Sequence, residues 1–255
     1  MPNAHGLGRI PSPPDDRDYK LATYLHPSLD IAQMIWGTGP VLDQGTSGHC
    51  VGFGFADWGN TLPVDDDYAN ADGDAIYYEC KVIDGEPQQE NGTYVRAGAK
   101  AMKKRGRLAA YAFGSLSDAK TFLLNHGPVV FGIDWYDGMF TPDAQGVVRP
   151  TGNVAGGHGI AAYGADATYC YLQQSWGKSW GVNGNCKITW ADLATCMANG
   201  GEACAAVELP VFVPTPPPAP PAPTPTPTGL KAALQAILAA FKAAVAALEK
   251  LITSL

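Results

Sequence analysis

Helical patterns of apolar and polar positions come early in the chain, and strand patterns come late. Helices are predicted over 49–60, 74–84, 93–106 and 117–127, the last of which starts with a Ser-Asp capping signal and ends at Gly127-Pro128. Strand character follows in PVVFGIDW, GIAAYGAD, TYCYLQQSW, GNCKITW and CAAVELPVFV, and one short helix, WADLATCMANG, interrupts these runs. Helices first and strands second predict an α+β fold with two packed halves.

Changes of composition divide the chain into four parts. Residues 1–16 form a predicted extended lead-in, and residues 17–213 form a folded domain of mixed composition. Residues 214–228, PTPPPAPPAPTPTPT, carry nine prolines in fifteen positions. They therefore predict a stiff polyproline II linker with a rise of about 3.1 Å per residue, about 45 Å in all. Residues 229–255 are rich in Ala, Leu and Lys and predict a helix.

The predicted helix over 229–255 carries a heptad seam of apolar residues. Its members alternate spacings of four and three: Leu230, Leu234, Ile237, Phe241, Ala244, Leu248, Leu251 and Leu255. So broad an apolar face must be buried against something. We expect self-association or docking onto a partner first, and packing on the chain's own body second. Binding to a membrane surface comes last, because the polar face is only weakly cationic.

Composition argues against several classes of function. The net charge of −7 does not fit a nucleic-acid-binding protein. The first 30 residues contain no apolar core of a secretory signal, and no run approaches the roughly 18 apolar residues of a membrane-spanning helix. Six cysteines without a CxxC pair predict neither a disulfide scaffold nor a zinc site. We therefore expect a cytoplasmic protein, or one of the host cytoplasm or virion if a phage encodes it, without metal or cofactor.

The stretch VLDQGTSGHCVGFGFA, residues 41–56, places Cys50 at the start of an apolar helix, where the helix dipole stabilises a thiolate. Taken alone, such a cysteine is more often a small core residue. His158 follows two glycines at the mouth of an apolar strand in GGHGIAAYG, and Gln44 lies six residues before the cysteine. A thiol, an imidazole and an amide donor are the groups that nucleophilic catalysis by cysteine needs.

Three motifs in this order resemble papain-like cysteine peptidases. DQGTSGHCVGFGFA resembles their Gln-Gly-x-x-Gly-x-Cys segment, GGHGIAAYG their histidine strand, and QSWGKSWGVNG their Asn-Ser-Trp-Gly-x-x-Trp-Gly-x-x-Gly signature. The resemblance covers roughly residues 17 to 213. It implies a helical half packed against a β-barrel-like half with the site in the cleft, and a thiol hydrolase that cleaves peptide bonds through an acyl-enzyme. The Ala- and Pro-rich tail favours a bacterial or phage type.

The resemblance also implies a role for each matching residue. Cys50 is the expected nucleophile, and His158 its partner and general base. Gln44 and the Cys50 backbone N–H are expected to bind the oxyanion. Trp176 is expected to shield the hydrogen bond that orients His158, and Gly48 to support the site.

The residue that orients His158 departs from the family pattern, because Gln174 stands where the family has asparagine. Its longer side chain predicts weakened or retuned activity. Two other functions stay open: a catalytically weak binding module tethered to an assembly by its C-terminal helix, and a lysin that cuts peptidoglycan peptides. His49 adjoins the nucleophile, and we expect it to be an exposed loop imidazole. The lead-in is too short for the helical propeptide of secreted members, and no Gly-Gly motif identifies the specificity pocket.

Overall fold

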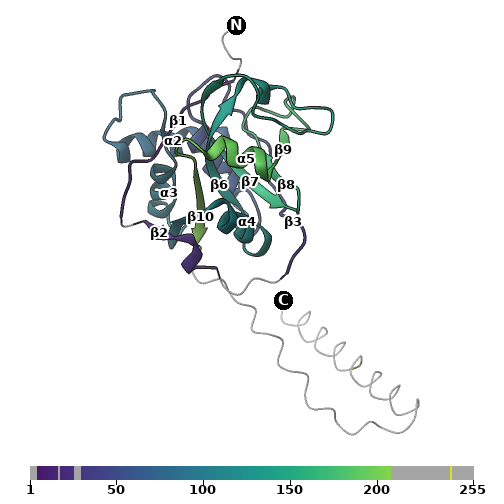
Figure 1. The fold of residues 1–255 in the computed structure, drawn as a ribbon. Coiled ribbons are helices and arrows are strands. Elements are labelled where there is room, and N and C mark those ends of the chain that lie inside the picture. Colours follow the sequence, from purple (N-terminus) through teal and green to yellow (C-terminus); the bar gives the residue numbers. More distant parts are fainter. Residues whose placement is uncertain (1–4, 17, 26–29, 208–241, 243–255) are drawn as a thin grey trace, which may run out of the picture. The chain divides into compact units, whose positions relative to one another are not determined.

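Three helices form the first half of the folded domain: α1 (Cys50–Gly59), α2 (Asn70–Asp84) and α3 (Val95–Lys104) (Figure 1). The computed structural model describes residues 5–16, 18–25, 30–207 and 242. The helices predicted over 49–60, 74–84, 93–106 and 117–127 and in WADLATCMANG are confirmed. However, α2 begins at Asn70 rather than at residue 74, because the Asp72 carboxylate accepts a hydrogen bond from the Ala69 N–H (2.8 Å) and caps an earlier first turn.

Helix α1 is the central element of this half, and all ten of its residues are buried. It packs against α2 on one side and against strand β7 (Val154–Ala165) on the other. The approach to β7 is so close that a Cβ on Gly159 would lie 3.0 Å from the Val51 Cα. Glycine at this position therefore lets the N-terminus of α1, which carries Cys50, rest directly on the strand that carries His158.

The second half is a mixed sheet of eight strands. Seven of them follow the order β2-β5-β10-β6-β7-β8-β9, and β3 pairs with β7. Their bounds, apart from β7, are β2 (Tyr19–Lys20), β3 (Met34–Ile35), β5 (Ala110–Phe113), β6 (Val129–Tyr136), β8 (Tyr169–Gln173), β9 (Asn185–Thr189) and β10 (Glu202–Val207). Helices α4 (Leu116–Asn125) and α5 (Trp190–Met197) and the 3-10 turns Leu21–Thr23 and Asp137–Phe140 complete this half. The predicted strands are confirmed over the described residues, which end at Val207 in the last of them, and the α+β class is confirmed as well.

The β-barrel-like half implied by the family resemblance is an open sheet. Among the described strands, β2 and β9 end the sheet and do not pair with each other. A separate pair of short parallel strands, β1 (Arg9–Ile10) and β4 (Thr93–Tyr94), lies outside this sheet. It joins the N-terminal segment to the helical half.

The two halves bury separate apolar cores that meet across β6 and β7. Because successive strand residues face opposite sides, Val130 and Ala161 belong to the helical core, while Phe131 and Ile160 belong to the core of the other half. The largest side chains of this second core are Trp135, Trp176 and Trp180. The active-site candidates lie where the two cores adjoin.

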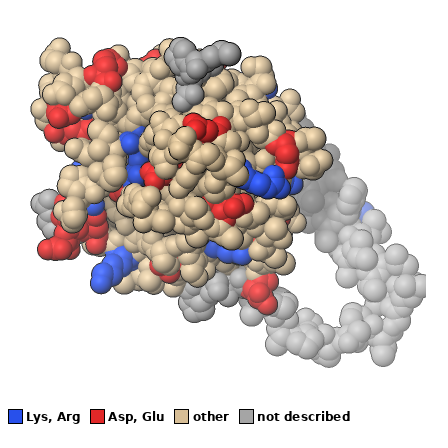
Figure 2. Space-filling model, turned by 45° about the horizontal axis from the view of Figure 1, so that its top comes forward, with Lys and Arg blue, Asp and Glu red and all other residues tan. Residues whose placement is uncertain are grey.

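The folded domain accounts for most of what the structure describes. The chain divides into two units, Met1–Leu209 and Pro210–Leu255. The predicted linker over 214–228 and the predicted helix over 229–255 lie outside the described residues, apart from Lys242. In the described part, no helix combines the length and the apolarity needed to cross a membrane. On the face drawn in Figure 2, basic side chains alternate with acidic ones and form no continuous basic surface.

Candidate active site

Cys50 is the first residue of α1, so its side chain lies at the positive end of the helix dipole. The thiol is completely buried. The backbone N–H of Gly159, on β7, donates a hydrogen bond to the Cys50 Sγ at 3.3 Å. The sulfur thus lies between the start of a helix and the strand that carries His158, in surroundings rich in N–H donors.

His158 lies on β7 opposite Ile133 and is completely buried. Its Nε2 lies 2.6 Å from the Gln174 Oε1. An amide oxygen only accepts hydrogen bonds, so Nε2 carries the proton and Nδ1 of the neutral ring keeps a free lone pair. Nδ1 has no hydrogen-bond partner in the described part of the chain. The ring therefore has one nitrogen fixed in position and one available as a base.

Aromatic rings enclose this imidazole on two sides. The Trp135 and Trp176 ring centroids each lie 5.0 Å from the His158 ring, and Trp176 also stacks on Phe140 with centroids 5.4 Å apart. They exclude water from the His158–Gln174 hydrogen bond. Such a bond is stronger in apolar surroundings than in water.

Gln174 follows the last residue of β8 and is itself completely buried. Its backbone N–H donates to the Gly184 carbonyl at 2.9 Å, which fixes the start of the loop after β8. The extra methylene of glutamine is accommodated here, because the side-chain oxygen reaches His158 at hydrogen-bond distance.

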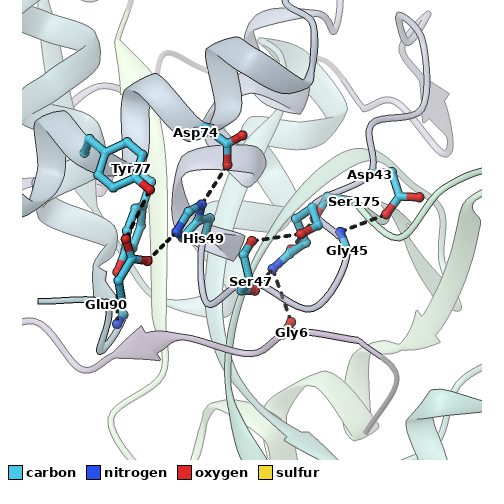
Figure 3. Close-up of polar contacts among 12 residues, drawn as sticks. Gly6, Asp43, Gly45, Ser47, His49, Asp74, Tyr77, Glu90 and Ser175 are labelled. Atoms are coloured by element: carbon cyan, nitrogen blue, oxygen red, sulfur yellow. Dashed lines mark hydrogen bonds and ion pairs between the residues drawn. The ribbon is translucent and has the colours of Figure 1, made fainter.

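Two neighbours, Ser175 and Ser47, hold the Gln44 side chain in one orientation; both are labelled in Figure 3. The Ser175 hydroxyl donates to the Gln44 Oε1 at 2.7 Å, and the Gln44 Nε2 donates to the Ser47 carbonyl at 2.7 Å. The same Nε2 also donates to the carbonyl of Gly6 at 3.3 Å. The Gln44 amide group is thus held by the Ser47 carbonyl in the loop before α1, and it also points at the Gly6 carbonyl oxygen.

Burial sets the protonation states of the two reactive groups. It raises the pKa of the Cys50 thiol, against the opposing effect of the backbone N–H groups of Gly159, Gly8, Val51 and Arg9. Burial also lowers the pKa of His158 to about 4, against the opposing effect of its hydrogen bond to Gln174. In this conformation the pair is therefore a neutral thiol and a neutral imidazole at pH 7.

A segment of the lead-in, residues 5–10, covers the site, and we call it the strap. The His5 ring stacks on Trp176 with centroids 4.6 Å apart. The Gly8 N–H donates to the Gly157 carbonyl at 3.1 Å, and the Gly8 carbonyl accepts from the Thr93 N–H at 2.8 Å. The strap thus contacts both halves of the domain, and Cys50 has no exposed surface beneath it.

The structure brings the predicted site residues together. Gln174 and Trp176 contact His158 directly, and the neighbouring Gly159 contacts Cys50. Gln44 and Trp176 both contact the strap, and a Cβ on Gly48 would lie 3.5 Å from the Leu7 carbonyl of the strap.

The expectation that His49 is an exposed loop imidazole is wrong. His49 is 5 % exposed, and its two ring nitrogens lie 2.7 Å from Asp74 and 2.8 Å from Glu90 (Figure 3). Its ring also stacks on Tyr77 with centroids 3.8 Å apart. The partners lie 25 and 41 residues farther along the chain, so no local pattern could reveal this cluster.

Three further features of the site were not found from the sequence. Ser175 lies inside the tryptophan motif, and its small hydroxyl next to Gln174 was the available signal. Trp135 ends a strand run, where an aromatic residue is ordinary. The strap has no distinctive composition, apart from two glycines in alternate positions.

Comparison with a protein-family model shows the family to which this chain belongs. The model of the papain family of cysteine proteases matches residues 65–205, which include His158 and Gln174 and follow Cys50. Because this match spans more than half of the chain, the chain belongs to the papain family of cysteine proteases. It is a thiol hydrolase, a cysteine-type peptidase. The bacterial or phage type stays a prediction.

Solved structures share the fold. Xylellain, a cysteine protease from Xylella fastidiosa, is similar with a TM-score of 0.63 and 17 % identity, covering 82 % of this chain and 98 % of that one. Digestive procathepsin L2 from Tenebrio molitor larval midgut is similar with a TM-score of 0.55 and 18 % identity. The match covers 80 % of this chain and 78 % of that one. The ragweed pollen allergen Amb a 11, a cysteine protease in its proform, is similar with a TM-score of 0.55 and 14 % identity. The match covers 86 % of this chain and 69 % of that one. A search of curated protein sequences found no match.

Proposed function

We propose that Cys50 is the nucleophile of this peptidase, that His158 is its general base and acid, and that Gln174 orients His158. The observation that carries the assignment is the pair of contacts around β7. The Gln174 Oε1 fixes the His158 Nε2 at 2.6 Å, and the next residue's N–H contacts the Cys50 Sγ at 3.3 Å. An imidazole with one nitrogen fixed and Nδ1 free, on the strand whose next residue contacts the thiol, supplies the base that thiol activation requires.

The first half of the reaction forms a thioester. The Cys50 proton moves to the His158 Nδ1, and the thiolate attacks the carbonyl carbon of the scissile peptide bond. The carbonyl oxygen gains the negative charge, which the Gln44 Nε2–H and the Cys50 backbone N–H stabilise. When the tetrahedral intermediate collapses, the C–N bond breaks and His158 gives its proton to the leaving amine.

The second half releases the acid product. A water molecule gives one proton to the His158 Nδ1, and its oxygen attacks the thioester carbonyl carbon. The C–S bond then breaks, and the sulfur leaves as the thiolate beside the protonated imidazole. Throughout the cycle, Gln174 keeps the ring oriented and Trp176 keeps water from their hydrogen bond.

The contact of Gln174 with His158 bears on the alternative of a catalytically weak binding module. That alternative is motivated by Gln174 in place of asparagine together with the predicted attachment helix over 229–255, and the contact bears on the first of these grounds. A distance of 2.6 Å in apolar surroundings supports the catalytic assignment instead.

Activity against a broad peptide library, together with covalent labelling by a thiol-directed epoxide, tests these roles. We expect label on Cys50 in Gly8→Ala, where the new methyl group would lie 2.0 Å from the Gly48 carbonyl oxygen and displace the strap, and none at this position once Cys50→Ala is added. The other five cysteines are free and buried, so they serve as internal controls. The assignment would be refuted if Cys50 were not labelled and no peptide were cleaved under any condition, in Gly8→Ala as well as in the parent.

We also propose that residues 229–255 mediate self-association or docking onto a partner. The supporting feature is the heptad seam of the sequence. Sedimentation of the full chain and of a chain ending at residue 228 tests it. A mass that falls to the monomer only in the shorter chain supports self-association. Equal monomeric masses would exclude self-association and leave docking to be tested by partner capture.

A cytoplasmic location is proposed on chemical grounds. All six cysteines are free thiols, which fits a reducing compartment. Fractionation of producing cells tests this, and recovery of the protein with the envelope or the medium would contradict it.

A further inference from the structure

The start of helix α1, which carries Cys50, has no ordinary cap. The N-cap residue is His49, and its side chain makes no hydrogen bond to the N–H groups of the first turn. No acidic residue lies in that turn either. Most helices place Ser, Thr, Asp or Asn at the N-cap, because the first N–H groups of a helix have no partner within it. Other contacts therefore hold the start of α1.

His49 is held from the side, by both nitrogens of its ring (Figure 3). Nδ1 lies 2.7 Å from an oxygen of Asp74, on α2, and Nε2 lies 2.8 Å from an oxygen of Glu90, in the segment between α2 and β4. Ionised carboxylates only accept hydrogen bonds, so each nitrogen donates and the ring is an imidazolium between two carboxylates. Charge-assisted hydrogen bonds of this kind are stronger than neutral ones. We call His49, Asp74 and Glu90 the clamp.

Further contacts fix the clamp in place. The His49 ring stacks on the buried Tyr77 ring, with centroids 3.8 Å apart and an angle of 20° between the planes. Lys81, also on α2 and 1 % exposed, donates to the Gly92 carbonyl at 2.9 Å. This bond fixes the end of the segment that presents Glu90. The His49 ring is therefore anchored by a stack and two hydrogen bonds, all to parts of the helical half.

The backbone of His49 leads directly into the oxyanion site. Its φ of −89° and ψ of 12° lie in the bridge region, which is sparsely populated and common at active sites. The ψ angle of residue 49 turns the peptide plane that carries the Cys50 N–H. At the other side of that plane, the His49 carbonyl accepts the first hydrogen bond of α1, from the Phe53 N–H at 3.1 Å. A shift of the anchored ring therefore turns the N–H that the proposed function assigns to the oxyanion.

The loop over residues 44–49 has one oxyanion donor at each end. Gln44 begins it, and the Cys50 N–H follows its last residue. Within the loop, the Gln44 side chain donates to the Ser47 carbonyl at 2.7 Å, and the Ser47 hydroxyl donates to the Gln44 carbonyl at 2.8 Å. Ser175 holds the first end through the Gln44 Oε1 at 2.7 Å. The clamp holds the second end, so the spacing of the two donors depends on both anchors.

Holding the helix start from the side keeps negative charge away from the cap position. A capping aspartate at position 49 would place a carboxylate next to the nucleophile, and a neighbouring like charge disfavours a thiolate. The carboxylates of the clamp lie at the surface instead. The side chains of Asp74 and Glu90 are 46 % and 60 % exposed, whereas Cys50 is completely buried. The clamp therefore restrains the helix start without a carboxylate at the cap.

We propose that His49 is a positioning residue for this reaction. Held between Asp74 and Glu90, its ring sets the direction of the Cys50 N–H, and with it the spacing of the two oxyanion donors. This inference rests on the proposed function, because it concerns the oxyanion site of the same nucleophile. The clamp acts on the step in which the carbonyl oxygen gains negative charge, and not on binding of the peptide. Its loss should therefore lower kcat and leave KM unchanged.

The double variant Asp74→Ala/Glu90→Ala of the full chain, in the Gly8→Ala background, tests the clamp. Both carboxylates are largely exposed, so their loss leaves the core intact. With a fluorogenic peptide, kcat should fall by about tenfold and KM should stay within about twofold, since small misplacements near the chemistry lower kcat steeply. Removing a whole oxyanion donor costs about 10²- to 10³-fold, which is the upper limit of the effect.

Two matched variants separate positioning from a general loosening of α2. Asp74→Asn/Glu90→Gln keeps a hydrogen-bonding oxygen opposite each ring nitrogen, and its kcat should stay within about threefold of the background. Glu79→Ala removes an acidic residue of the same helix whose carboxylate pairs with Arg105 at 2.9 and 3.0 Å. Its kcat should stay within about twofold, as expected for a surface ion pair. A tenfold fall in Glu79→Ala would overturn the specific role of the clamp.

Alkylation of Cys50 by iodoacetamide separates the oxyanion site from the thiol. This displacement occurs at a saturated carbon and forms no oxyanion, so its rate in the double variant should stay within about twofold of the background. Equal falls in alkylation and in hydrolysis would show that the clamp acts on the thiol. An unchanged kcat in the double variant would show a clamp that is merely structural. Either result would overturn the proposal.

Hydrogen–deuterium exchange of residues 44–52 measures the same restraint without catalysis. Exchange in this segment should be faster in the double variant than in the Gly8→Ala chain, and unchanged in Glu79→Ala. If the Gly8→Ala chain cuts no peptide and its Cys50 resists alkylation, the proposed function fails, and the exchange still decides whether the clamp holds the loop. Exchange that is unchanged in the double variant would overturn the clamp in either case.

Discussion

Replacing Gln174 by asparagine, the residue usual in the family, should lower the activity of this peptidase. Asparagine is shorter by one carbon–carbon bond, about 1.5 Å. With the backbone fixed by the Gln174 N–H bond to Gly184, its oxygen would withdraw from 2.6 Å to about 4 Å from the His158 Nε2. The buried Nε2–H would then have no partner.

The size of the effect follows from the free energy of that lost contact. Leaving a buried donor unpaired costs about 1–3 kcal/mol. If the bond counts in the transition state, where the ring is charged, and not in the free enzyme, kcat/KM should fall by about 5- to 150-fold. The loss should lie mostly in kcat, because the Gln174 side chain contacts His158 and its backbone N–H contacts Gly184.

The assay uses a fluorogenic peptide in the Gly8→Ala background, so that the cleft is open. Gln173→Asn is the control, since it makes the same change one residue earlier, where the buried side chain donates to the Pro40 carbonyl at 3.4 Å instead of contacting His158. Its kcat/KM should stay within about threefold of the background, as expected for a site away from the chemistry. Unchanged or higher activity in Gln174→Asn would refute this account of how His158 is oriented.

Three other groups give stability predictions, each checked by urea unfolding. Burial lowers the pKa of His158 from 6.5 to about 4, so the unfolded chain binds a proton in that window and the folded one does not. The unfolding free energy should therefore fall by about 3 kcal/mol between pH 6.5 and 4, and His158→Gln should remove that part of the slope. An unchanged slope would show that the imidazole is not desolvated. Burial raises the pKa of Asp57 well above 3.8, and both its oxygens lack a hydrogen bond in the described part of the chain. Stability is lost as pH rises and the unfolded chain ionises, so Asp57→Asn should stabilise by about 1–3 kcal/mol at pH 7 and by less at pH 4; a loss at pH 7 would contradict this. His49→Ala removes two hydrogen bonds to carboxylates and a stacked ring, and should destabilise by about 1–3 kcal/mol. A change below 0.5 kcal/mol would mean that the cluster contributes little.

The elements of the fold could be predicted because their signals are local. Helix α4 begins at Leu116, next to a Ser115–Asp118 capping pair, close to the position that the sequence indicated. Strand β6 begins with VVFGI, five consecutive buried residues without a charged or polar side chain, as expected for a strand buried on both faces. The early start of α2 and the openness of the sheet could not be predicted, because they depend on a cap formed by Asp72 and on which strands pair at the edges.

The candidate site divides in the same way. Cys50, His158 and Gln44 follow from motifs, whereas their protonation states follow from burial that only the folded chain shows. Glutamine differs from asparagine by about one bond length. The sequence does not show whether the backbone places the Gln174 oxygen at hydrogen-bond distance from His158. The strap joins residue 6 to residue 44 and residue 8 to residue 157, and such long-range contacts leave no periodic signal.

The rate of Cys50 alkylation as a function of pH tests the central claim most directly. In the parent, where burial raises the pKa of the thiol, the rate should stay low up to alkaline pH. In Gly8→Ala the midpoint should fall well below the roughly 8.5 of a free thiol, because the open cleft allows a thiolate–imidazolium pair. Adding His158→Gln to Gly8→Ala should return the midpoint of the alkylation rate to the roughly 8.5 of a free thiol. A midpoint near 8.5 in Gly8→Ala, unmoved by the loss of His158, would contradict the pairing of Cys50 with His158.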